Sequence, residues 1–113
     1  MAERYDADLQ NIGGIVLPKV PSGYKSSWAQ YTLRSTQRES IRKALSDVDI
    51  PTGIYYPKAL HLQTAFAYLG GAAGDFPVAE QLSSEVFSLP MHPYLGVSAQ
   101  QKILSLLLAV RYQ

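Results

Sequence analysis

The densest group of side chains that could take part in chemistry lies in the segment Gly53–Gln63. It holds two adjacent tyrosines, Tyr55 and Tyr56, then a proline, a lysine and His61. A tyrosine hydroxyl can donate or accept a hydrogen bond, so an exposed one is free to meet a ligand. Adjacent residues in a strand face opposite sides, and we therefore expect one tyrosine in the core and the other exposed. Two interpretations are open: the group contacts a ligand, or it only stabilises the fold, with His61 capping a turn.

The other residue types with catalytic or metal-binding chemistry form no recognisable motif. His61 and His92 are far apart and have no companion at metal-ligand spacing, so no metal site is predicted. The serines lie in no nucleophile-elbow pattern, and neither a Walker sequence nor Gly-x-Gly-x-x-Gly is present. The glycine-rich segment Gly70–Gly74 follows no convincing buried strand, so we interpret it as a surface loop. The absence of cysteine excludes a disulfide scaffold and a thiolate metal site.

Length and composition predict one ordinary globular domain over residues 1–113. The chain has 113 residues, of which 47% are hydrophobic, and a domain of this size buries roughly 65% of the surface of its unfolded chain. Ten Lys and Arg face nine Asp and Glu, for a formal charge of +1, and the charges are scattered. No apolar run approaches the roughly 18 residues of a membrane span, and the polar N-terminus is not a secretory signal. We therefore expect a cytoplasmic protein that binds neither nucleic acid nor membrane.

Hydrophobic periodicity predicts three or four helices and about three short strands. The helices are expected over residues 3–11, from Thr36 to about Asp49, from Asp75 to about Val86, and from Ser98 to Val110. The strands are expected over residues 15–17, 28–34 and 52–56, with a last extended piece at 88–90 and a helical turn near His61–Ala67. This order of elements indicates the α+β class: a small, mainly antiparallel sheet of about three strands, with helices packed on one face.

Capping patterns and apolar stripes set the expected helix boundaries and buried faces. Thr36–Glu39 and Ser98–Gln101 match the capping box, in which two side chains satisfy free backbone donors reciprocally. Asp75 is expected to cap the third helix. The apolar stripes expected to face the core are Ile41, Ala44, Leu45 and Val48 in the second helix, Val78, Leu82 and Val86 in the third, and Ile103, Leu106, Leu107 and Val110 in the last.

Four stretches of the sequence carry a family resemblance as an ordered set. They are Ser27–Arg34, Ile50–Gln63, Gly74–Glu80 and Leu89–Leu95, which read SWAQYTLR, IPTGIYYPKALHLQ, GDFPVAE and LPMHPYL. In this order and with this spacing they resemble the C-terminal domain of the DegT/DnrJ/EryC1/StrS aminotransferases, fold-type-I enzymes that act on nucleotide-linked keto-sugars. The resemblance covers roughly residues 3–110. No single stretch is decisive, but the set is specific.

The resemblance implies the C-terminal small domain of a pyridoxal-phosphate-dependent aminotransferase, without the large domain that holds the cofactor. Such enzymes transfer an amino group, usually from glutamate, to a nucleotide-linked keto-sugar, and are typically homodimers. Their cofactor forms a Schiff base with a lysine of the large domain. None of the lysines of this chain lies in a segment like the family's lysine segment: Lys19, Lys25, Lys43, Lys58 and Lys102. We therefore expect no pyridoxal phosphate bound to this chain and no transamination by it alone.

Carried over from the family, the candidate substrate contacts are Tyr55 and Tyr56, with His61 as a third. Tyr56 and the following proline keep the family pattern, whereas Tyr55 stands where many relatives carry a histidine, so the sugar is not identified. A tyrosine hydroxyl can hydrogen-bond a sugar oxygen, and the ring can pack on the sugar face. His92 is expected to hold the turn before the last helix. Arg34 is expected either to form a surface ion pair or to lie near the substrate.

Two alternatives stand beside this interpretation. One is a non-catalytic binding or interaction module that has reused the domain, and the other is an independent small α+β protein. A domain separated from a larger partner should expose an apolar patch where that partner docks, whereas a stand-alone module should be polar there. The character of the surface therefore distinguishes an enzyme domain from an interaction module.

Overall fold

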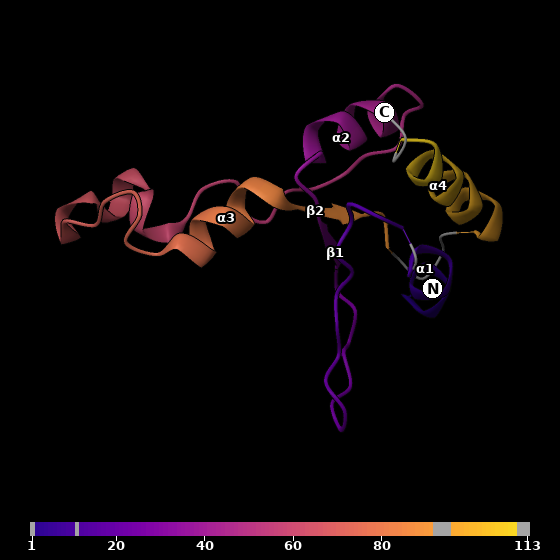
Figure 1. The fold of residues 1–113 in the computed structure, drawn as a ribbon, viewed down its shortest axis with the longest axis horizontal. Coiled ribbons are helices and arrows are strands. Elements are labelled where there is room, and N and C mark those ends of the chain that lie inside the picture. The colour runs from indigo at the N-terminus through magenta and orange to yellow at the C-terminus, as the bar shows by residue number, and fades with distance from the viewer. Residues whose placement is uncertain (1, 11, 92–95, 111–113) are drawn as a thin grey trace.

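The computed structural model of the chain describes residues 2–10, 12–91 and 96–110 (Figure 1). Its elements, in chain order, are α1 (Ala2–Leu9), β1 (Tyr31–Arg34), α2 (Arg38–Ser46), η1 (Leu60–Leu62), η2 (Thr64–Leu69), α3 (Pro77–Glu85), β2 (Val86–Leu89) and α4 (Val97–Val110), where η marks a 3₁₀ helix. The four expected helices are present, and the helical turn expected near His61 consists of η1 and η2. The expected α+β class, with an antiparallel sheet, is confirmed.

The sheet consists of β1 and β2, whose four residues each pair antiparallel. Single bridges continue the ladder on either side of this pair. Val16 exchanges backbone hydrogen bonds of 2.8 and 3.1 Å with Arg34 of β1. Gly53 exchanges bonds of 3.2 and 2.7 Å with Ser88 of β2. The chain segments around Val16 and Gly53 therefore flank the two strands, one on each edge.

The sheet has two strands where about three were expected. The segments 15–17 and 52–56 contribute one bridge each. Pro18 borders the first segment, and Pro51 and Pro57 border the second, and a proline has no N–H to donate to a ladder. The strand expected over 28–34 begins only at Tyr31. Trp28 has a positive φ of 53°, in the left-handed region, and a strand requires extended backbone. Local backbone geometry thus shortens each predicted strand.

The hydrophobic core lies between the sheet and the helices α1, α2 and α4 (Figure 1). Tyr31 and Leu33 of β1 point into it, as the period-two pattern predicted. The other large buried members are Tyr5, Leu9, Ile41, Leu45, Phe87, Leu89, Ile103, Leu104 and Leu107. The apolar stripes expected on the second and last helices are therefore confirmed at their central positions.

Two buried tyrosines join the first helix to the sheet and to the segment after β2. The Tyr5 hydroxyl donates a hydrogen bond of 2.9 Å to the Pro90 carbonyl, and the Tyr31 hydroxyl donates to the Asp6 carboxylate. The two rings lie 4.8 Å apart, and both side chains are fully buried. Burial raises the pKa of Tyr5 to about 12. Burial, with the hydrogen bond to Asp6, raises the pKa of Tyr31 further, so both phenols stay protonated at neutral pH.

The capping box expected at Thr36–Glu39 is wrong. The N-cap residue of α2 is Gln37, which makes no side-chain cap hydrogen bond. The Ser35 hydroxyl instead accepts a bond of 3.0 Å from the Gln37 N–H. Because the helix begins later than the pattern assumed, Glu39 lies in its first turn and pairs with Arg38 at 2.9 Å.

The two other predicted caps are also wrong. The Asp75 carboxylate closes the preceding turn by accepting a bond of 2.8 Å from the Ala72 N–H. The N-cap residue of α3 is Phe76, which has no side-chain group for this purpose. The last helix begins at Val97, so Ser98 lies inside α4 and not at its N-cap. The capping pattern therefore did not predict where α3 and α4 begin.

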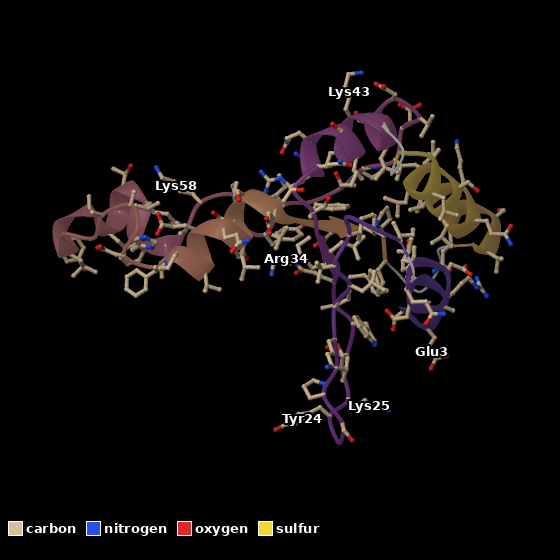
Figure 2. All side chains as sticks on the ribbon, viewed as in Figure 1. Glu3, Tyr24, Lys25, Arg34, Lys43 and Lys58 are labelled. Atoms are coloured by element: carbon tan, nitrogen blue, oxygen red, sulfur yellow. The ribbon has the colours of Figure 1, made fainter. Side chains whose placement is uncertain are left out.

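Two segments project from this body in different directions (Figure 1). The first, called the hairpin below, comprises residues 16–34 and carries Tyr24 and Lys25 at its tip (Figure 2). The second, called the arm below, comprises residues 55–85 with η1, η2 and α3. The radius of gyration is 15.6 Å, against about 13 Å for a compact chain of this length. The hairpin and the arm therefore leave an open angle beside the sheet.

The side of α3 that was expected to be buried lies outside the core cluster. Val78 is 68% exposed, Leu82 is half-buried, and Val86 belongs to β2. The buried residue of α3 is Glu85, whose carboxylate pairs with the Arg34 guanidinium at 2.8 Å. The expected burial is wrong because the arm projects away from the core. Arg34 forms the ion pair that was one of its two expected roles, at the root of the arm.

Candidate functional site

A cavity of about 320 Å³ lies where the base of the hairpin, the segment before the arm, and β2 meet. Its lining comprises Ala29, Gln30, Pro51, Thr52, Gly53, Tyr55, Ser88, Leu89, Pro90 and Met91. The Gly53 bridge to Ser88 holds two sides of this cavity together. Backbone hydrogen bonds between Gly53 and Ser88 thus join two of its lining segments, and Tyr55 is the aromatic side chain of the lining.

The Tyr55 ring lies at this cavity close to Gly53, in space that a larger residue at position 53 would occupy. A Cβ atom at Gly53 would lie 2.7 Å from the Tyr55 Cε2 and 2.8 Å from its hydroxyl oxygen, well inside van der Waals contact. The ring therefore folds back over the glycine, and it remains 47% exposed. A side chain in this position presents a hydroxyl and a ring face to any molecule that enters the cavity.

Tyr56 lies beside Tyr55 and is more exposed. The two ring centroids are 5.7 Å apart with an interplanar angle of 80°, and Tyr56 is 70% exposed. The expectation that one of the two tyrosines is in the core is wrong. It assumed that strand alternation continues through the segment, but pairing with β2 ends at Gly53. Both hydroxyls are therefore available at the surface, although only Tyr55 lines the cavity.

The cavity contains three polar side chains that the sequence did not single out. The Thr52 hydroxyl accepts a hydrogen bond of 3.0 Å from Arg42, and the Ser88 hydroxyl lies 2.8 Å from that of Thr32. These two groups are already engaged, which leaves the exposed Gln30 amide as the third. Strand alternation had placed Gln30 on the side away from the core. Nothing in the sequence, however, indicated that this side would meet Tyr55.

His61 lies elsewhere, in a groove of about 630 Å³ on the arm. Its ring packs edge-on against Phe76, with centroids 4.8 Å apart. Its Nε2 lies 3.5 Å from the Glu80 carboxylate, which is too long for a well-formed hydrogen bond, and Nε2 is buried with no hydrogen-bond partner. The structure therefore brings Tyr55 and Tyr56 together but places His61 with Glu80, in a separate groove.

The part of the chain that the structure describes contains neither a cluster of side chains that could hold a metal ion nor a helix that could span a membrane. Within residues 2–10, 12–91 and 96–110, no three His, Asp or Glu side chains gather where a metal ion could be held. None of the helices described in this chain has the length and apolar character needed to cross a bilayer. His92, expected to hold the turn before the last helix, lies outside the described residues.

The sequence matches a family profile over nearly its whole length. The profile is that of the DegT/DnrJ/EryC1/StrS aminotransferase family, and it covers residues 1–108. The chain belongs to this family. Membership in the DegT/DnrJ/EryC1/StrS aminotransferases agrees with the resemblance carried by the four sequence stretches.

Individual family members are similar to the chain in sequence and in fold. A dTDP-3-amino-3,4,6-trideoxy-alpha-D-glucose transaminase of Micromonospora megalomicea subsp. nigra is 42% identical over 108 residues, which is 92% of this chain and 29% of that protein. A DegT DnrJ EryC1 StrS aminotransferase from Brucella abortus superposes with a TM-score of 0.88 at 40% identity. DesV from S. venezuelae superposes with a TM-score of 0.95 at 28% identity. Both structures cover 99% of this chain, which covers 30% of each of them. The chain thus spans about 30% of the length of the relatives it matches.

The residues around the cavity do not fit the family cofactor. Pyridoxal phosphate requires a lysine amine for its Schiff base and an acidic partner for its pyridinium nitrogen. The cavity lining contains neither a lysine nor a carboxylate. All five lysines of the chain, in the part that the structure describes, are exposed: Lys19, Lys25, Lys43, Lys58 and Lys102. What the cavity offers is a small set of hydrogen-bonding and aromatic groups suited to a neutral, oxygen-rich ligand.

Proposed function

We propose that this chain is the C-terminal small domain of a pyridoxal-phosphate-dependent aminotransferase. The complete enzyme would transfer an amino group from glutamate to a keto-sugar carried by a nucleoside diphosphate. The observation that carries the proposal is a pair of exposed tyrosines, Tyr55 in the wall of a cavity and Tyr56 beside it, in a chain that matches this family over residues 1–108. The named activity of the Micromonospora relative supports the substrate class.

In this proposal the chain binds and orients the sugar nucleotide. The Tyr55 hydroxyl and the Gln30 amide, both at the cavity, hydrogen-bond sugar oxygens, and the Tyr56 ring packs on the sugar face. His61 is a third proposed contact, for a part of the substrate that reaches the arm. A cavity of about 320 Å³ takes only part of such a ligand, so the rest must be bound by groups outside this chain.

The cofactor and the chemistry are assigned to the part of the enzyme that this chain does not contain. Pyridoxal phosphate, when bound there, carries the amino group between donor and acceptor. The isolated chain is accordingly proposed to bind no cofactor and to have no transaminase activity. The complete enzyme is proposed to be cytoplasmic and homodimeric.

The alternative function is a non-catalytic interaction module derived from the same domain. The two functions differ in the surface they require, since a stand-alone module should be polar where an enzyme domain meets its catalytic partner. The exposed Leu60, Leu69 and Phe76 on the arm support the enzyme domain.

A chimera tests the proposed function. The Micromonospora relative would keep its own sequence except for the matched segment, which this chain would replace. We expect glutamate-dependent transamination of that relative's substrate. In the chimera, Tyr55→Phe should raise KM about 5-fold, the effect of one lost hydrogen bond of about 1 kcal/mol. Tyr24→Phe, at a tyrosine of the hairpin tip that is 76% exposed and outside the cavity, is the matched control.

Several results would contradict the proposal. A chimera that folds and holds pyridoxal phosphate but does not turn over would remove the assigned role. The same conclusion would follow if Tyr55→Phe and Tyr56→Phe behaved like Tyr24→Phe. Covalent capture of pyridoxal phosphate by the isolated chain, with turnover, would overturn the division of labour between the two parts of the enzyme.

A further inference from the structure

We propose that the apolar face of the arm is the surface on which the cofactor-binding domain of the aminotransferase docks, an inference that rests on the proposed function. The face comprises three large side chains that line one groove and are each more than half exposed: Leu60 at 62%, Leu69 at 69% and Phe76 at 57%. Tyr68 at 80% and Val78 at 68% are further exposed side chains of the arm. Single exposed apolar residues are ordinary, but a group of this size on one segment marks an interaction site.

The face surrounds a groove and is not a flat surface. The groove, about 630 Å³ in volume, is lined by Leu60, Phe66, Leu69, Phe76 and Ala79, with Gly70, Gly71, His61 and Asp75. Of the two polar side chains, His61 lies against Glu80, and Asp75 accepts a hydrogen bond from the Ala72 N–H. Asp75 is therefore engaged within the arm, whereas the His61 Nε2 is buried and has no hydrogen-bond partner. The groove offers its occupant mainly apolar contacts, so the matching surface of the occupant must be apolar too.

Within the part of the chain that the structure describes, the face is left exposed, and the arm is joined to the body at its root. There the Arg34 guanidinium pairs with Glu85, and Arg38 donates hydrogen bonds of 2.7 Å to the Ser83 carbonyl and 3.3 Å to the Val86 carbonyl. Beyond this point the arm extends away from α1, α2 and α4 (Figure 1). A segment that holds its apolar side chains away from its own core needs a second surface to bury them.

The occupant follows from the comparison with longer chains. DesV superposes on 99% of this chain with a TM-score of 0.95, so the arm keeps its position in an enzyme of which this chain spans only 30%. The Brucella enzyme gives the same result with a TM-score of 0.88. The arm conformation is therefore the one present when the remainder of the enzyme is attached. The remainder, which includes the cofactor-binding domain, is the body large enough to cover the face.

The test compares the double substitution Leu60→Ser and Leu69→Ser in the isolated chain and in the chimera described above. Because both side chains are exposed, the Tm of the isolated chain should change by less than about 1 °C. In the chimera the same substitutions remove buried contacts, and the Tm should fall by about 3 °C or more. Val97→Ser, at a residue that is 50% exposed at the start of α4, is the matched control and should change neither Tm.

An unchanged Tm of the doubly substituted chimera would overturn the proposal. A second copy as occupant would appear as a dimer of the isolated chain in light scattering that Leu60→Ser and Leu69→Ser convert to a monomer, and this too would overturn it. If the double variant of the chimera does not fold, Leu69→Ala alone gives the same comparison with a smaller fall in Tm. The readout is independent of turnover. An inactive chimera with an arm-dependent Tm refutes the proposed function alone, and an active chimera with an arm-independent Tm refutes the docking alone.

Discussion

The ion pair at the root of the arm is expected to be the strongest charged interaction in the described chain. The Glu85 carboxylate accepts two hydrogen bonds from Arg34, at 2.8 Å from Nη2 and 3.1 Å from Nε, and the side chain of Glu85 is 11% exposed. Glu85→Gln removes the charge and keeps the shape. Glu39 offers a matched control, because it pairs with Arg38 at 2.9 Å but is 71% exposed.

The expected cost of Glu85→Gln follows from burial. Removing one partner of a fully buried pair costs about 3–5 kcal/mol, because the other charge is left without a partner. Arg34 is 35% exposed and recovers part of this by hydration, and the glutamine oxygen can still accept one hydrogen bond. We therefore expect a loss of about 1–2 kcal/mol in the free energy of unfolding. Exposed pairs contribute about 0–1 kcal/mol, so Glu39→Gln should cost about 0.3 kcal/mol.

Urea unfolding followed by circular dichroism measures both costs. For a chain of this size the slope is about 1.5–2 kcal/mol per molar urea, so Glu85→Gln should lower the midpoint by about 0.5–1 M. Glu39→Gln should lower it by about 0.2 M. The slopes must agree among the variants for the comparison to hold. Equal midpoints for Glu85→Gln and Glu39→Gln would refute the reasoning, because burial of the pair would then carry no energetic weight.

Three further outcomes are expected. In Gly53→Ala the new methyl group displaces the Tyr55 ring, so the Tyr55 ring resonances should shift while the unfolding midpoint changes little; an unshifted spectrum contradicts the contact. The pKa values of Tyr5 and Tyr31 are raised above 10, so the folded state keeps protons that the unfolded state releases. Stability is therefore full below pH 10 and should fall above it by about 1 kcal/mol per pH unit for each tyrosine, and a flat stability profile to pH 11.5 contradicts this. Leu107→Ala creates a cavity at a 1% exposed site and should cost about 2–4 kcal/mol in urea unfolding, with less than about 1 kcal/mol indicating that the site collapses.

The part of the fold that the sequence predicted well is the part whose partners lie in the same chain. The stripes containing Ile41 and Leu45 in α2, and Ile103 and Leu107 in α4, lie in the common core as their spacing indicates. The stripe of α3 has the same kind of spacing, yet Val78 lies in solvent. Periodicity shows which side of a helix is apolar, but it does not show whether the surface that covers this side belongs to the same chain.

The candidate site was predicted only in part, for a reason that concerns pairing. The sequence located Tyr55 and Tyr56 as the residues of interest, and both lie exposed at or beside a cavity. It could not show that pairing with β2 ends at Gly53, which determines that neither tyrosine is in the core. It also grouped His61 with the tyrosines by proximity along the chain, whereas the fold places it against Glu80 on the arm. Proximity along the chain therefore identified the segment that contains Tyr55 and Tyr56, but it did not identify Glu80 as the residue beside His61.

The contacts between α1 and the last third of the chain have a consequence for biosynthesis. The Tyr5 hydroxyl bonds to Pro90 and the Arg4 guanidinium to Gln100, across 85 and 96 residues of sequence. During synthesis the inward-facing side of α1 therefore stays uncovered, and the core that it shares with α4 is incomplete until α4 has been made. A polypeptide truncated before Gln100 would lack Ile103, Leu104 and Leu107 of this core, and would leave Tyr5 and Leu9 without these packing partners.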